Sequence, residues 1–224
     1  MLTHPAEARR RFREYATEEI GNHNLAFGAL LIALEDNPGL DIDRYVGALD
    51  ELAERAERRC VRGEPPVFRL GHLHAEMFDV DRYIGDANSY YDPRNAYLHE
   101  VIDRKAGLPI SLSIIFLHVA AKLGLSAAGV GLPGHYVVKV QFELNEVYVD
   151  PFHSGTTLTM TEIGELLRQV SGGNIQLASE HLRAWTGRET LVRVLGNLQN
   201  MWNRAGDSRK SAAARERMEL LAST

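Results

Sequence analysis

Cysteine is nearly absent from this sequence: the chain of 224 residues has one, Cys60. A single thiol excludes a disulfide framework and a cysteine-based metal cluster within one chain, and it fits a reducing compartment. No apolar run approaches the ~20 residues of a membrane span. Residues 1–13 are charged where a secretory signal would be apolar. We therefore expect a cytoplasmic protein that does not associate with membranes.

An excess of positive charge is also missing. The chain has 25 lysines and arginines against 30 aspartates and glutamates, a net charge of -5. A protein that follows nucleic-acid phosphates needs a basic face, so we predict no nucleic-acid partner. The arginines at residues 9–13 are more typical of a solvated helix than of a binding patch.

Common cofactor signals are missing too. The glycines between Gly129 and Gly134 are not followed by the helix that a phosphate-binding loop requires. His72 and His74 are two residues apart, so they would point to different faces of a helix rather than share a metal. The sequence accordingly predicts neither a cofactor nor a metal.

The first half of the sequence has helical patterning, and 45% of all residues are apolar, enough for a core. Apolar spacing, caps and breakers predict helices over residues 1–19, 24–35, 42–59, 67–78, 92–106 and 111–123, with a loop at 79–89. The helix at 111–123 is apolar almost all round, which is typical of a buried helix.

After Gly124 the period changes to that of strands. Strands are predicted at residues 127–131, 136–142 and 147–150, with a turn near Asn145 joining the last two. Helices followed by adjacent strands favour an α+β fold over an alternating α/β fold.

The remainder of the sequence is expected to be helical. One short helix should begin at Thr161, and a second should cover residues 179–186. Two longer helices should cover residues 189–204 and 208–222. The last pair has the character of one helix-turn-helix repeat. A single pair is too few for an independent array, so we expect it to pack on the main domain.

Two serines could act as a nucleophile at the start of the buried helix. The dipole and free amides at a helix N-terminus stabilise negative charge next to Ser111 or Ser113, and the amides could form part of an oxyanion hole. The alternative is a simple N-cap, for which serine is a favoured residue.

His135 and Asp150 could complete a catalytic group. His135 opens the second predicted strand, and a neutral imidazole can take a proton from a hydroxyl. Asp150 ends the next strand, so antiparallel pairing would bring it near His135, where it could fix the tautomer. The alternatives are a hydrogen-bonded histidine at a strand edge and an aspartate that caps a turn before proline.

Four motifs together resemble the SirB-type branch of the transglutaminase-like superfamily. They are YYDPRN at residues 90–95, GLPISLS at 107–113, GVGLPGHY at 129–136 and VDPF at 149–152. The resemblance is close over residues 88–158 and looser elsewhere. It implies a papain-like α+β core with a tetratricopeptide-like tail, and a similar domain occurs in an F-box protein. On this basis we expect a helical N-terminal region at 1–87, a transglutaminase-like core at 88–186 and a shortened tail at 187–224.

The superfamily implies a cysteine nucleophile at a helix start, with a strand histidine and a strand aspartate or asparagine. His135 and Asp150 match, but serine stands where the cysteine is expected, with Ser111 our first choice and Ser113 the second. Cys60 lies outside the motifs and is not a replacement. A thiolate attacks well at neutral pH, whereas a serine hydroxyl needs a well-aimed base.

Three functions follow from this substitution. The favoured hypothesis is a weakly active or inactive pseudoenzyme that binds a peptide or acyl group in the triad cleft. The second is a working serine-triad hydrolase or acyltransferase that uses a covalent intermediate. The third is a scaffold whose terminal helices recruit a protein partner.

Overall fold

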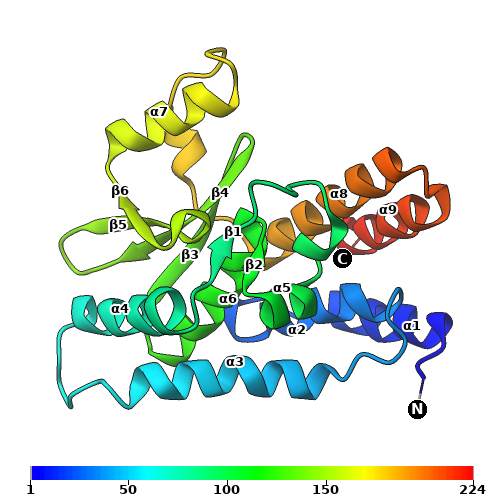
Figure 1. The fold of residues 1–224 in the computed structure, drawn as a ribbon, viewed down its shortest axis with the longest axis horizontal. Helices are drawn as coiled ribbons and strands as arrows, with labels where there is room; N and C mark the ends of the chain where they lie inside the picture. The colour runs from blue at the N-terminus through cyan, green and yellow to red at the C-terminus, as the bar shows by residue number, and fades with distance from the viewer. Residues whose placement is uncertain (1, 224) are drawn as a thin grey trace.

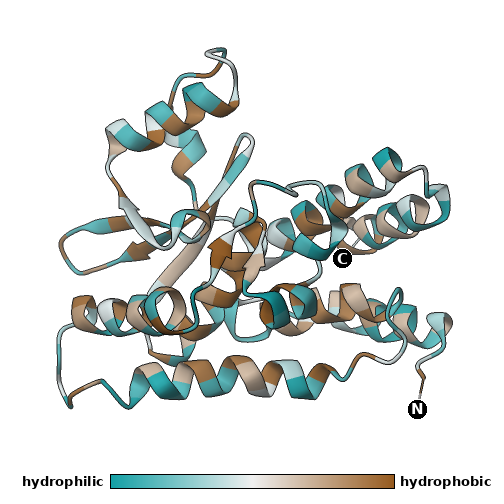
Figure 2. Cartoon of the chain, viewed as in Figure 1, coloured by the Kyte–Doolittle hydropathy of each residue, from teal (hydrophilic) through white to brown (hydrophobic). Residues whose placement is uncertain are grey.

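A helix buried along nearly its whole length, α6 (Pro109–Lys122), forms the centre of the molecule. The computed structural model describes residues 2–223. In it α6 packs against α2 (Asn22–Leu34) and α3 (Ile42–Glu57) and also against the four-stranded sheet. The sequence requires this position because α6 has no polar face to leave in water. Each fully buried leucine or isoleucine on it contributes roughly 1.5–3 kcal/mol relative to exposure. Figure 2 shows the apolar colour concentrated at this centre.

The other elements surround this helix. They are α1 (Pro5–Ala16), α4 (Pro66–His74), a π-helical turn (Ala75–Val80), β1 (Ile84–Gly85), a 3-10 turn (Pro93–Asn95), α5 (Leu98–Arg104), β2 (Ala106–Gly107), β3 (Ser126–Leu132), β4 (His135–Gln141), β5 (Glu146–Asp150), a second 3-10 turn (Pro151–His153), β6 (Thr156–Leu158), α7 (Met160–Val170), a third 3-10 turn (Ser179–Leu182), α8 (Gly187–Ala205) and α9 (Ser208–Ala222).

The sheet is antiparallel with the strand order β3-β4-β5-β6. Its two faces are both covered. One face contributes Val138, Val140 and Val149 to the main core around α6. The other contributes Val137 and Tyr148 to a smaller core with the apolar stripe of α7, which lies at the top of Figure 1. The change from helices to adjacent strands confirms the predicted α+β class.

The last two helices form a hairpin that turns at Gly206, whose φ of 77° is in the left-handed region that favours glycine. Leu191, Leu195 and Leu198 of α8 are buried in the main core, and α8 packs on α2. No helix within residues 2–223 has the length and apolar character needed to cross a membrane.

Several predicted boundaries are wrong in detail. The segment 79–89 is not all loop, because β1 pairs in parallel with β2. The helix predicted over 92–106 is two elements: Asp92 caps a 3-10 turn, and the extended backbone at Tyr97 separates it from α5. Helix α7 is capped by Thr159, which accepts from the amide of Glu162, rather than beginning at Thr161.

Three further differences concern short elements. The helix predicted over 67–78 ends as α4 at His74 and continues as a π-helical turn. The segment 179–186 holds only a 3-10 turn. Strand β6 was missed because its three residues are exposed or half-buried and show no alternation of polarity. The helix predicted over 1–19 begins at Pro5, and Met1 lies outside the described residues.

Candidate functional site

The ends of two neighbouring strands bring His135 and Asp150 together. Nε2 of His135 lies 2.8 Å from Oδ2 of Asp150. The β4–β5 ladder pairs Val138 with Val149, so continuing its register sets Asp150 opposite Val137. His135 is then the diagonal neighbour of Asp150 on the same face of the sheet, a separation that long side chains can bridge. The hydrogen bond engages Nε2 and leaves Nδ1 as the other nitrogen available to a ligand.

Asp150 is a fully engaged carboxylate. Its Oδ1 accepts from the backbone amides of Phe152 and His153, and its Oδ2 also contacts Nδ1 of His153 at 2.8 Å. Burial raises the pKa of Asp150, but the hydrogen bonds and charges of His135 and His153 outweigh burial, so its pKa lies below the ordinary value. Asp150 is therefore an ionised anchor for two imidazoles.

His153 was not predicted as a site residue. It ends the 3-10 turn after β5, its ring stacks on His135 at a centroid distance of 5.8 Å, and its side chain is 57% exposed. The only sequence signal was its position three residues after Asp150 in a turn beginning with proline. Asp150 thus caps that turn and also binds His135, so the two roles that the sequence offered as alternatives, turn cap and histidine partner, are both present.

Phe152 fixes the position of the histidine pair from the side. Its ring meets His135 edge-on at a centroid distance of 5.8 Å and Tyr90 at 6.2 Å. Behind it lies Gly85 of β1, where an added Cβ would be 2.3 Å from the Phe152 ring. The short β1–β2 pair thus supports the site, because only glycine leaves room for this ring.

The two candidate serines differ in their hydrogen bonding. Pro109 occupies the first turn of α6 and Leu108 is the capping residue, so neither serine is an N-cap. The hydroxyl of Ser113 donates to the carbonyl of Pro109 at 2.8 Å. The hydroxyl of Ser111 is buried and has no hydrogen-bond partner among residues 2–223, so it makes no hydrogen bond with His135. The structure brings His135 and Asp150 together and leaves Ser111 outside their network.

An open cleft of about 580 Å³ lies in front of the histidines. Its walls come from the segment before α5, the His135 and His153 turns, α7 and α8. The lining residues are Ala87, Tyr90, Tyr91, Gly134, His135, Phe152, His153, Leu166, Gln169, Val170, Arg193, Asn197, Asn200 and Met201. Ser111 is not among them, whereas Tyr90 and Tyr91 of the first motif are.

Arg193 is the cation inside this cleft. It lies on α8, and it makes no hydrogen bond or ion pair with any residue of the part of the chain that the structure describes. Nearby, the Arg204 guanidinium lies 3.9 Å from the centroid of the Tyr91 ring. The cleft therefore combines aromatic walls, side-chain amides and an available positive charge.

Cys60 belongs to another part of the molecule, on the link between α3 and α4. Burial, with the nearby Glu64 carboxylate, raises the pKa of the Cys60 thiol to about 11. A thiol with such a pKa is protonated at neutral pH and is a poor nucleophile. It is therefore not a candidate nucleophile.

The comparison with family models decides the relationship. Residues 43–196 match the model described as the transglutaminase-like superfamily. The chain belongs to the transglutaminase-like superfamily. Its match includes α6 and all four strands of the main sheet, the elements that carry Ser111, His135 and Asp150.

Curated members similar to this transglutaminase-like chain come from bacteria and animals. A "UPF0162 protein" of Xylella fastidiosa strain 9a5c is 34% identical over 79% of this chain and 66% of its own length. The protein of the same name from strain Temecula1 is 34% identical over 84% of this chain and 67% of its length. "F-box only protein 21" of Mus musculus is 26% identical over 67% of this chain but 24% of its own length. The chain thus spans about two thirds of the bacterial relatives, and no solved structure matches it.

Proposed function

We propose that this transglutaminase-like protein binds a peptide in the cleft beside His135 and does not carry out rapid acyl transfer. The observation that supports this most directly is that the histidines face the cleft whereas the candidate nucleophile does not. His135 and His153 line an open cleft, whereas Ser111 is 1% exposed and its hydroxyl has no hydrogen bond to a base among the described residues. The protein keeps the pocket and the histidine–aspartate pair without an activated nucleophile.

The chemistry of oxygen supports the same conclusion. A serine hydroxyl becomes nucleophilic when a base within about 2.6–3.2 Å removes its proton during attack. Within residues 2–223 the Ser111 hydroxyl has no such contact, and the Ser113 hydroxyl donates to a backbone carbonyl. This argues against the second hypothesis, a working serine-triad hydrolase.

The lining of the cleft favours a peptide that has a carboxylate. The amide side chains of Gln169, Asn197 and Asn200 can pair with peptide groups. The guanidinium of Arg193, which has no ion-pair partner in the described part of the chain, can hold a carboxylate with two parallel hydrogen bonds. Tyr90 and Tyr91 add apolar surface with polar ends.

We also infer the finer relationship that the four motifs suggest, the SirB-type branch. The α8–α9 hairpin supports it as a shortened counterpart of the tetratricopeptide-like tail. On the same basis we propose that the chain divides into three regions, with boundaries after residues 87 and 186. A third function, a scaffold, would use the hairpin rather than the cleft.

The test is a binding measurement with two short capped peptides of identical sequence, one ending in a carboxylate and one in an amide. Isothermal titration calorimetry with the full chain should detect binding of both peptides and give a lower dissociation constant for the one that ends in a carboxylate. Arg193→Gln should weaken the acid at least about tenfold, the order expected for losing a charge-assisted pair of hydrogen bonds, and leave the amide nearly unchanged.

Arg209→Gln is the matched control, since it removes the same charge from an exposed position on α9. It should leave both affinities unaltered. If both arginine variants lost the same affinity for the carboxylate peptide, its binding would depend on the overall charge of the protein rather than on Arg193. If neither peptide bound, the proposal would be refuted.

A further inference from the structure

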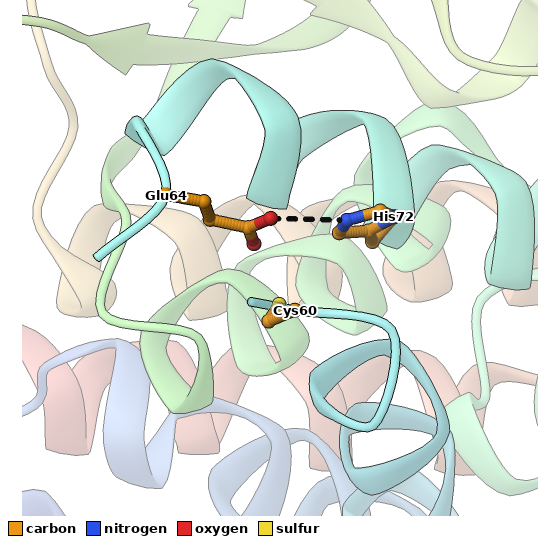
Figure 3. A group of neighbouring side chains, drawn as sticks. All are labelled: Cys60, Glu64 and His72. Carbon is orange, nitrogen blue, oxygen red and sulfur yellow. Dashed lines mark hydrogen bonds and ion pairs between the residues drawn. The ribbon is translucent and has the colours of Figure 1, made fainter. Parts of the chain in front are cut away.

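Three side chains of metal-ligating type meet on the link between α3 and α4, away from the cleft. They are Cys60 and Glu64 of the link and His72 of α4, and one ligand atom from each lies within 4.8 Å of the others. Figure 3 shows Glu64 and His72 facing each other from opposite sides, with Cys60 below the line that joins them.

The local backbone fixes this convergence. A turn between Cys60 and Glu64 is closed by the amide of Glu64 donating to the carbonyl of Val61 at 3.0 Å. Gly63 supplies the left-handed φ of 79° that the turn needs. Pro65 and Pro66 then start α4 at once, which restricts how Glu64 can move relative to His72.

The Glu64 carboxylate is only partly satisfied. Its side chain is 9% exposed, and Oε2 lies 3.3 Å from Nε2 of His72. The other oxygen, Oε1, is buried with no hydrogen-bond partner among residues 2–223. An ionised oxygen buried without a partner is costly, so its surroundings point to a positive or hydrogen-donating group that binds there.

We propose that Cys60, Glu64 and His72 form a binding site for a divalent cation of the zinc type. Sulfur, imidazole nitrogen and carboxylate oxygen are all ligands of zinc, with bonds of about 2.0–2.3 Å. Ligand atoms around such an ion are about 3.3–3.8 Å apart by tetrahedral geometry. The three groups already lie within 4.8 Å, so small side-chain rotations suffice.

The charges of the site balance around such an ion. On binding, the Cys60 thiol loses its proton to solvent, and the thiolate with the Glu64 carboxylate neutralises the two positive charges of the metal. Cys60 also borders a cavity of about 370 Å³ whose lining includes Arg62, Arg69 and Lys122. These cations favour an anion, such as chloride or a carboxylate, as the fourth ligand.

This site does not follow from sequence spacing. We predicted no metal because His72 and His74 are two residues apart. The partners of His72 are eight and twelve residues earlier, on a link whose path depends on the packing of α3 against α4. The site shares no residue with the lining of the peptide cleft and does not depend on the proposed function.

The test uses the full chain, treated with a chelator, dialysed and titrated with Co²⁺ or Zn²⁺. One equivalent of Co²⁺ should give the strong visible bands of a low-symmetry site and a near-ultraviolet thiolate charge-transfer band. Zn²⁺ should displace it and raise the unfolding temperature by several degrees. Cys60→Ser should abolish the charge-transfer band, and both Cys60→Ser and His72→Gln should weaken Zn²⁺ binding at least ~10-fold.

His74→Gln is the control, because His74 lies on the same helix and is 40% exposed. It should bind Zn²⁺ as the wild type does. His135, Asp150 and His153 also form a group within 4.8 Å, so His153→Gln distinguishes the two places. The proposal is overturned if no stoichiometric metal binds, or if binding survives Cys60→Ser and is lost in His153→Gln.

Discussion

At the residue scale, the two serines at the start of α6 have opposite energetic roles. Ser111 buries a hydroxyl without a partner among the described residues, whereas Ser113 satisfies its hydroxyl on the carbonyl of Pro109. Burying an unpaired polar group costs free energy, and a made hydrogen bond returns about 0.5–1.5 kcal/mol. The buried Ser111 hydroxyl therefore lowers the stability of the fold at the position where the superfamily pattern implies the nucleophile.

We expect Ser111→Ala to leave the free energy of unfolding unchanged or raise it by about 1 kcal/mol, because it removes the unpaired hydroxyl. Ser113→Ala should lower it by about 1 kcal/mol. Urea denaturation followed by circular dichroism measures both. A clear loss of stability in Ser111→Ala would mean that its hydroxyl has a partner.

Asp150 gives a prediction about pH. Its pKa is below the ordinary value in the folded state, so its ionised form stabilises the fold above the unfolded pKa of about 3.9. This contribution is lost as the pH falls through the lower, folded pKa. Asp150→Asn should lower the free energy of unfolding by about 2–3 kcal/mol at pH 7, because two imidazoles lose their anion.

The difference between wild type and Asp150→Asn should shrink as the pH falls below about 4, because the unfolded chain then binds a proton at Asp150. It should vanish only below the lower, folded pKa, where the wild-type carboxyl is itself neutral. Asp79→Asn is the control: its side chain is 71% exposed, and the change should stay within about 0.5 kcal/mol. A difference that is constant from pH 7 to pH 3 would refute an ionised Asp150.

Much of the site was accessible from the sequence. His135 and Asp150 could be paired because one opens a strand, the other ends the next, and a turn at Asn145 joins them. The lack of a hydrogen-bond partner for Ser111 among the described residues could not be predicted, since the contacts of a hydroxyl on a helix buried all round depend on its neighbours. His153 was missed because it follows the strand in a turn, where no periodicity marks a side chain.

At the scale of elements, the short β1–β2 pair supports the site from behind. An added Cβ at Gly85 would overlap the Phe152 ring, and this ring contacts His135. Gly85→Ala should therefore lower stability by about 1–3 kcal/mol through overpacking and change the nuclear magnetic resonance signals of the His135 ring.

Gly47→Ala is the matched control in α3, where an added Cβ meets no atom within 4 Å. It should raise stability by about 0.5–1 kcal/mol, because alanine favours a helix interior. If both glycine variants behaved alike, the close approach of Phe152 to Gly85 would be wrong.

The longer elements were predictable and the shorter ones were not. Helix α6 and strands β3–β5 have clear apolar patterns, which local sequence determines. The β1–β2 pair has two residues on each side, and β6 has three. Such pieces are strands only because tertiary packing supplies a partner, and the break at Tyr97 inside a predicted helix has the same kind of cause.

At the scale of the whole molecule, one core unites regions that the sequence suggested as separate parts. Its buried residues come from α1, α2, α3, α4, α5, α6, β4, β5, α8 and α9. In addition, Arg217 of α9 is buried and donates to the carbonyl of Ile32 in α2. Elements that share a core in this way are expected to unfold together.

We predict a single cooperative unfolding transition. The two tryptophans report on different parts: Trp202 lies on α8 of the tail, whereas Trp185 precedes α8 and its backbone amide donates to the carbonyl of Gly129 in β3. Their fluorescence and the helical circular dichroism signal should give coincident urea curves. A fluorescence transition at lower urea than the dichroism transition would mean that the tail unfolds independently.

The central claim is that the cleft binds without a working serine nucleophile, and labelling with a fluorophosphonate probe tests it most directly. After incubation of the full chain from pH 6 to pH 9, peptide mapping by mass spectrometry should find no adduct on Ser111, because its hydroxyl is buried and unpaired with His135. An adduct on Ser111 that disappears in His135→Gln would contradict the account and identify an active serine enzyme.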